Sequence, residues 1–250
     1  MKLEELLSEL RENLLRDDAD LASGPDDKLW SDETLVRYIN DAQQRFARKT
    51  LSLRDASTPE VVQVTLATGV SSYSLHASVL AVVSGRYDVD TADLARIGRT
   101  RVMTIPKEDP AWFDPSTVNQ MNPARPIAFS TDETLDVDTK AVTLTVYPAP
   151  SATEDGKIIY MRVARLPLER FTIDDTSAEC ELDEDYQLDM IEWAAYRALR
   201  TSDIDGHSDA AEKHRDRFME AGDQVLKDIR RKMQAPITWE FGRNGFTWEN

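Results

Sequence analysis

The spacing of apolar residues changes twice along this chain, and this change limits the fold more than any other feature of the sequence. Apolar residues recur at helical spacing over residues 2–15 and again over 31–49. Between residues 59 and 180, β-branched residues at strand spacing replace this pattern, and helical spacing returns after residue 181. Strands enclosed by helices predict an α+β fold, in which the helices from both ends pack on one another as a bundle.

Each expected helix has a face of apolar residues that needs a partner to pack on. The first helix carries its leucines on this face, namely Leu3, Leu6, Leu7, Leu10 and Leu14. Ser31 is a suitable N-cap for the second helix, and Ser208 is one for the last helix, which runs to about residue 233. The helix over 186–201 includes Leu188 and Trp193 and is apolar over most of its circumference, so we expect it at the centre of the bundle.

Several segments of the middle region are expected to form strands of an antiparallel sheet or sandwich. They cover residues 61–66, 79–83, 101–105, 126–130, 141–147 and 157–165. Ser84-Gly85 is expected to end the second strand. The last two strands are separated by Pro148 and by a turn at Asp155-Gly156, which predicts a hairpin with a longer loop. Residues 106–126 hold prolines and aromatic residues, which predict a long irregular loop.

These patterns divide the chain into four parts. Residues 1–58 and 181–234 are predicted to supply the N-terminal and C-terminal helices of one helical domain. A β-rich region is inserted between them at 59–180, and residues 235–250 form an aromatic C-terminal tail. A chain of 250 residues is long enough for one large domain or two small ones, each with a core of its own.

The charge of the chain limits the class of partner. Its formal net charge is −16, and acidic residues outnumber basic ones in each third of the sequence. A protein that grips a phosphate backbone needs Lys and Arg at the contacts, so the chain as a whole is not expected to bind nucleic acid tightly. Nine acidic residues lie between Arg170 and Arg197 with no basic residue among them. They suit the N-terminal end of the following helix, or they form a docking or cation-collecting surface.

The sequence also bears on location. No stretch approaches the roughly 20 apolar residues that a membrane-spanning helix needs, so we expect no membrane span. The first residues, Met1 to Glu5, are acidic where a signal peptide would be basic, and no apolar core follows them. These features predict a soluble protein that is made in the cytoplasm.

The residues that usually carry catalysis are few and scattered. The sequence contains no nucleophile elbow, zinc-protease motif, P-loop or dinucleotide-binding motif. Of the three histidines, only His207 and His214 are close in sequence, and His207 precedes the helix that carries His214, so we expect neither to be a catalytic base. Cys180 is the only cysteine, which excludes an internal disulfide, and its acidic neighbours Glu179 and Glu181 are expected to raise its pKa. We therefore expect no enzymatic activity and no cofactor.

One acidic segment resembles a calcium-binding loop between two helices. Asp203, Asp205, Gly206, Asp209 and Glu212 match positions 3, 5, 6, 9 and 12 of such a loop. Thr201 stands at position 1, where an aspartate is expected, so the first ligand is weakened or absent. A polar turn between two helices explains the same residues, and we expect no metal site here.

The C-terminal tail is the segment that most suggests a partner. Its large aromatic residues are Trp239, Phe241, Phe246 and Trp248. Such residues are costly to leave in water, so the tail folds back on its own core or docks on a partner. The last helix ends in a basic cluster of Lys227, Arg230, Arg231 and Lys232, which compensates the helix dipole or contacts DNA or an acidic neighbour.

Several stretches, taken in order, resemble one protein family. Residues 29–50, with Trp30, Ser31, Asp32, Tyr38 and Asn40, resemble the opening helix of phage head-to-tail adaptor proteins, although Glu33 stands one place early. These proteins are also called head–tail connector or tail tubular proteins. Three later segments are similar to the strand ends and the tryptophan-containing helix of that family, and a fourth resembles the helix after it: 144–150, 159–168, 185–200 and 208–218. The resemblance covers roughly residues 29–232.

The resemblance implies a structural protein of the virion neck of a tailed bacteriophage. Members of this family assemble beneath the portal as rings, typically of twelve copies, and give a tail or nozzle protein a surface to attach to. They extend the channel through which double-stranded DNA leaves the head. The DNA passes through this channel without recognition of its sequence. Such a protein is expected to assemble in the cytoplasm of the host bacterium.

Two other functions fit parts of the sequence. A different virion component, such as a tail-completion or minor tail protein, would use the same aromatic tail and the same lack of catalytic motifs. A metal-dependent enzyme or calcium-binding module would use the acidic residues, and calorimetry with calcium and magnesium would distinguish it from the structural functions.

Overall fold

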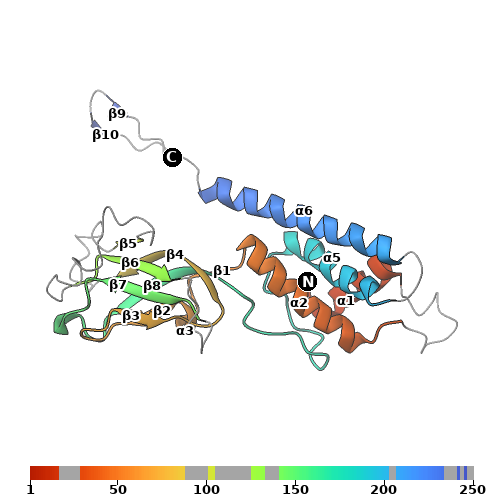
Figure 1. Ribbon diagram of the computed structural model, residues 1–250, viewed down its shortest axis with the longest axis horizontal. Coiled ribbons are helices and arrows are strands. Elements are labelled where there is room, and N and C mark those ends of the chain that lie inside the picture. Colours follow the sequence, from red (N-terminus) through yellow and green to blue (C-terminus); the bar gives the residue numbers. More distant parts are fainter. Residues whose placement is uncertain are drawn as a thin grey trace.

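The computed structural model describes residues 1–16, 29–87, 101–104, 125–132, 141–202, 207–233, 241–242 and 245–246. Its helices and largely antiparallel strands confirm the α+β prediction. Buried hydrophobic side chains gather in two clusters, one among the helices and one among the strands. Figure 1 shows the helices and the sheet lying side by side, with β1 at the junction between them.

The helical part combines segments from both ends of the chain. Its elements are α1 (Leu3–Glu9), the π-helix η1 (Leu10–Leu15), α2 (Asp32–Thr50), α5 (Glu184–Arg200) and α6 (His207–Met233). Helix α5 contacts η1, α2 and α6, which confirms its predicted central place. The leucine face of the first helix is buried in this core, where Leu3, Leu6 and Leu10 are fully shielded from solvent.

The structure confirms one of the two predicted N-caps and contradicts the other. Ser31 caps α2, because its side chain accepts a hydrogen bond from the Thr34 backbone N–H at 3.3 Å. The prediction of Ser208 as the cap of the last helix is wrong, since α6 already includes His207. We counted Leu188 among the apolar residues of the central helix, but it is 51% exposed, because α5 turns Gln187 and Ile191 inward instead.

The β part is one sheet that folds over its own core. Its strands are β1 (Arg54–Asp55), β2 (Gln63–Thr65), β3 (Ser72–Ser74), β4 (Val79–Tyr87), β5 (Arg101–Thr104), β6 (Ala128–Asp132), β7 (Thr143–Tyr147) and β8 (Ile158–Arg165). Neighbours follow the order β1-β8-β4-β5-β6-β7-β3, and β2 also pairs with β8. The β5–β6 pair is parallel and the others are antiparallel. Residues 105–124, which cover most of the predicted irregular loop, lie outside the described residues.

Two predictions about the strands are wrong. The segment that begins at Val61 starts as a short helix, α3 (Pro59–Val62), because Pro59 occupies its first turn, where a proline is favourable. The expected hairpin of the last two strands does not form, since β7 pairs with β3 and β6 whereas β8 pairs with β1, β2 and β4. Alternation marks which side chains face the core, but it does not choose the partner strand.

Strand β4 also continues through Ser84-Gly85, where we expected it to end. Gly85 is buried and lies beneath the fully buried ring of Phe129 on β6. A Cβ at position 85 would lie 2.9 Å from the Cε1 atom of Phe129, which is closer than carbon atoms pack. Glycine is needed at this position so that the two halves of the folded sheet can approach each other, and it does not serve as a strand terminator.

One buried ionic cluster joins the helical part to the β part. The Arg165 guanidinium at the end of β8 donates to the Asp55 Oδ2 atom at 2.7 Å and to the Glu181 Oε2 atom at 2.6 Å. Burial alone would raise the pKa of Asp55, but hydrogen bonds from Ser57, Thr58 and Arg165 outweigh it and hold the pKa well below its usual range. Asp55 is therefore ionised in the folded protein. Arg165 binds Asp55 on one passage of the chain between the two parts and Glu181 on the other.

We predict that Gly85→Ala lowers the free energy of unfolding by about 1–3 kcal/mol, because the added methyl group overpacks the core against Phe129. Urea unfolding followed by circular dichroism measures this change. Adding Phe129→Leu to the variant makes room, so the two substitutions together are expected to cost less than their sum. Ser84→Ala on the outer face is the control, and an unchanged Gly85→Ala midpoint would contradict the packing described here.

We predict that Asp55→Asn costs about 2–4 kcal/mol at neutral pH, because it removes one partner from a buried charge. Since the folded pKa is lowered, the ionised Asp55 stabilises the protein above the ordinary aspartate pKa, and this stabilisation is lost as pH falls. The difference between wild type and variant is therefore constant above about pH 5 and shrinks below about pH 4. Denaturant titrations at several pH values measure it, with the exposed Glu220→Gln as control. A difference independent of pH would contradict the stabilising role of the ionised Asp55.

Candidate functional site

The aromatic tail is only partly within the described residues. Trp239 and Trp248 lie outside them, as do the side chains of Phe241 and Phe246. The structure describes two short strands of the tail, β9 (Phe241–Gly242) and β10 (Gly245–Phe246), which pair with each other. Among the described strands, neither joins the main sheet, and Figure 1 places the pair beyond the C-terminal end of α6. The partner-binding role of the tail residues stays a prediction.

The predicted basic cluster lies on the last turns of α6. Lys227, Arg230 and Arg231 are exposed, and the side chain of Lys232 lies outside the described residues. Arg231 approaches Asp228 at 3.5 Å, a contact on the same helix. The buried positions of α6 reach Val225, and Ile229 is partly buried, so the basic turns extend past the core. The cluster is thus accessible to a partner as well as favourable for the helix end.

The calcium-loop residues are divided between described and undescribed positions. Asp203 and Asp205 lie outside the described residues, whereas Asp209 and Glu212 belong to the first turns of α6. Glu212 pairs with Arg215 on its own helix. Within the described part of the chain, no group of three or more His, Cys, Asp or Glu side chains could hold a metal ion.

The histidines and the cysteine have structural partners. His214 is buried and contacts Glu192, which also lies 3.6 Å from Arg217. The rings of His207 and Trp30 stack with centroids 6.2 Å apart. Burial raises the pKa of the Cys180 thiol, and Glu181 raises it further, as the acidic neighbours suggested. The thiol lies 3.8 Å from the Gln43 Oε1 atom at the edge of the helical core, and its raised pKa makes it a poor nucleophile.

Two adjacent residues of α2 connect this helix to distant segments. The side-chain amide of Asn40 exchanges two hydrogen bonds of 2.9 Å with the Phe171 backbone N–H and C=O. The Asp41 Oδ2 atom accepts from the Trp193 indole N–H at 2.8 Å and from Arg197 at 3.0 Å. The opening-helix segment and the tryptophan-containing helix, which are far apart in sequence, therefore contact each other directly.

Beside this contact lies a cationic groove, defined by Arg45, Arg48, Lys49, Trp193, Arg215, Asp216, Phe218 and Met219. Its cavity volume is about 690 Å³, and it is shaped by α2, α5 and α6. The rings of Trp193 and Phe218 form its apolar base, with centroids 5.2 Å apart, and the Arg45 guanidinium lies 4.4 Å above Trp193. Lys49 pairs with Asp223 at 2.5 Å.

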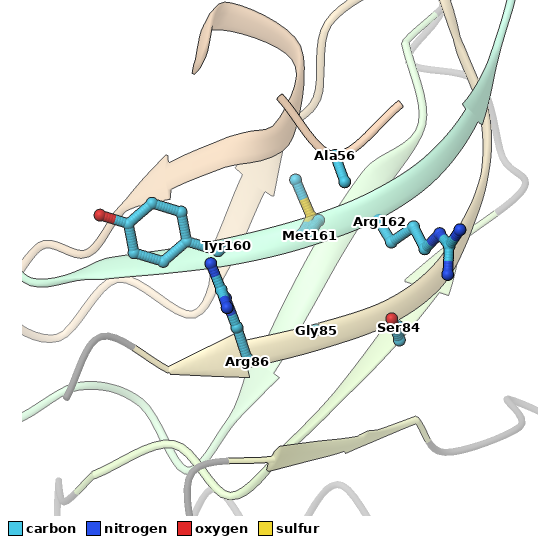
Figure 2. A pocket seen from close by; sticks show the side chains of 7 residues that line it. All are labelled: Ala56, Ser84, Gly85, Arg86, Tyr160, Met161 and Arg162. Atoms are coloured by element: carbon cyan, nitrogen blue, oxygen red, sulfur yellow. The ribbon is translucent and has the colours of Figure 1, made fainter. Parts of the chain in front are cut away.

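A second hollow, the sheet pocket, lies on the outer face of β4 and β8. It is lined by Ala56, Ser84, Gly85, Arg86, Tyr160, Met161 and Arg162 and has a volume of about 430 Å³. Figure 2 shows the Arg86 side chain beside the Tyr160 ring, with Arg162 on the same strand as Tyr160; the Arg86 guanidinium lies 5.3 Å from the ring centroid. Both arginines are exposed, and neither forms an ion pair with another described residue. The sheet pocket therefore offers two positive charges to an anionic group.

Sequence reasoning missed the cationic groove. Arg45, Arg48 and Lys49 lie at i, i+3 and i+4 at the end of α2, where basic residues also compensate the helix dipole. Their spacing on one face is the signal that could have indicated a cationic surface. The apolar base comes from α5 and α6, so its presence depends on how the helices pack.

Comparison with known proteins gives a match to one family. The family model described as SU10 adaptor protein matches residues 1–240 of the chain. The matched region includes both buried clusters, the cationic groove, the sheet pocket and all of α6. No curated protein matches the chain. In the described part of the chain, no helix has both the length and the apolar character that crossing a membrane requires.

Proposed function

The chain belongs to the SU10 adaptor protein family, a phage head-to-tail adaptor family, and we propose that it forms a ring beneath the portal of the virion. The match over residues 1–240 is the observation that carries this proposal. The ring has twelve copies in the proposal, lies in the neck, extends the DNA channel and gives the tail or nozzle protein its attachment surface. Assembly takes place in the cytoplasm of the host bacterium.

The charge of the chain supports passage of DNA through such a ring. A net charge of −16 repels phosphate groups, so double-stranded DNA slides past the wall without adhering to it. This role needs no sequence recognition and no catalysis, and we propose that the protein has no enzymatic activity. The basic turns of α6 are a local exception that is suited to contact with DNA or with an acidic neighbour.

The end of α6 and the tail support contact with the portal. α6 extends past the core, and its exposed Lys227 and Arg230 lead into the segment with Trp239, Phe241, Phe246 and Trp248. Tryptophan and tyrosine commonly anchor protein interfaces, and a segment that orders on binding lets assembly wait for the partner. In the proposal, residues 1–58 and 181–234 form the helical domain that carries this tail, and 59–180 are inserted in it.

We predict that deletion of residues 237–250 weakens binding to portal rings from the same genome by about 30-fold or more, because it removes the aromatic anchors. Co-sedimentation with purified portal rings measures the binding. The thermal unfolding midpoint should not change, since among the described side chains the helical core ends at Ile229 of α6.

Single substitutions distinguish loss of the portal contact from loss of stability. Trp239→Ala and Trp248→Ala should each weaken portal binding, whereas Trp30→Ala, which removes a buried core residue, should lower stability. A truncated chain that unfolds would place the tail in the core of the protein itself. A truncated chain that is folded and binds the portal unchanged would overturn the proposed portal contact of the tail.

A further inference from the structure

The cationic groove combines features that call for a partner. Its lining includes four basic side chains and one acidic side chain, in a protein with a net charge of −16. Arg48 is exposed and has no ion pair or hydrogen bond with another described residue. Met219 at the edge of the groove is 43% exposed. The other three basic side chains pair with Asp41, Asp223 and Glu212. An apolar base beside the unpaired charge of Arg48 therefore fits a segment that is both acidic and apolar.

Such a segment is present in the chain itself. We define the acidic turn as residues 172–176, which contain Ile173, Asp174 and Asp175. Its residues are exposed, and Ile173 is 41% exposed although it is a large hydrophobic residue. Asp174 has no ion pair or hydrogen bond with another described residue. The turn thus presents an apolar side chain next to two carboxylates.

The acidic turn is held at both ends. Before it, Phe171 is bound by the side-chain amide of Asn40. At its other end, the Thr176 C=O accepts from the Glu4 N–H at 3.0 Å, and the Ala178 C=O accepts from the Leu3 N–H at 2.9 Å. The turn itself is closed by the Asp175 N–H, which donates to the Thr172 C=O at 3.2 Å. A segment fixed in this way loses little conformational entropy when it binds.

The groove and the turn lie on different sides of the same helix. Asn40, which holds the turn, and Arg45, which lines the groove, are five residues apart on α2, or about 140° around the helix axis. One copy therefore cannot insert its own turn into its own groove. When two complementary surfaces lie on different sides of a protein, each copy can bind the next one in the same way along a chain of copies. Such contacts form closed rings when the rotation between copies allows it.

We propose that the cationic groove of each copy receives the acidic turn of the next copy in the ring. In this contact Ile173 covers the apolar base at Trp193 and Met219, and Asp174 pairs with Arg48. The inference rests on the proposed ring function and identifies the surfaces through which neighbouring copies associate. Because the pairing is ionic at its edge, association should weaken as salt concentration rises.

A charge-swap experiment tests the contact. Arg48→Glu and Asp174→Lys are each expected to weaken ring assembly by about tenfold or more, because each places like charges opposite one another. An equimolar mixture of the two variants restores it, since each groove then meets a turn of opposite charge in an alternating ring. The double variant Arg48→Glu/Asp174→Lys restores assembly with itself for the same reason. Lys213→Glu, an equal charge change at an exposed position on α6 outside the groove, is the control and should have no effect.

Sedimentation velocity of the full chain, alone and with portal rings, measures assembly, and circular dichroism verifies that each variant is folded. Wild type that assembles while Arg48→Glu assembles equally well would overturn the groove contact and leave the ring function intact. If the two variants fail to assemble alone and also fail to assemble as a mixture, the groove contact is overturned as well. Wild type that neither self-associates nor binds the portal would overturn the proposed function and the groove contact together.

Discussion

Arg165 holds together the two passages of the chain between helices and strands. Its guanidinium binds Asp55 on the outgoing passage and Glu181 on the returning one, and its backbone N–H donates to the Leu53 C=O at 2.9 Å. Glu181 in turn accepts from the Leu168 N–H at 2.6 Å, which fixes the start of the returning segment. The hydrophobic clusters on either side are separate, so this buried ionic contact sets how one is placed on the other.

The fold could be predicted where local spacing decides it. The leucines of the first helix, the Ser31 cap and the central helix with Trp193 follow from periodicity and capping, and the structure confirms them. The partners of β7 and β8 could not be predicted in this way, because strand pairing joins residues far apart in sequence. The continuation of β4 through Gly85 is a similar case, since its reason is the ring of Phe129 on another strand. Non-local packing accounts for each of these differences.

The functional surfaces likewise include one that local spacing predicts and one that depends on non-local packing. The basic residues at the end of α6 were visible in the sequence, and the structure places Lys227, Arg230 and Arg231 on its exposed last turns. The cationic groove was not visible, because Trp193 and Phe218 reach it from helices that are distant from Arg48 in sequence. The family resemblance, which the match over residues 1–240 confirms, indicates an adaptor role that local patterns could not supply. Asn40, Asp41 and Trp193 join segments that are far apart in sequence, since these residues hold α2 to its neighbours.

The proposed contacts of this adaptor all depend on its forming a ring on the portal. Electron cryo-microscopy of portal rings saturated with the full chain, beside each component alone, tests it most directly. We expect an added layer of density below the portal, with the symmetry of the portal and with the helical parts of neighbouring copies in contact. A portal that stays bare at high adaptor concentration would contradict the account and would place the protein further along the tail.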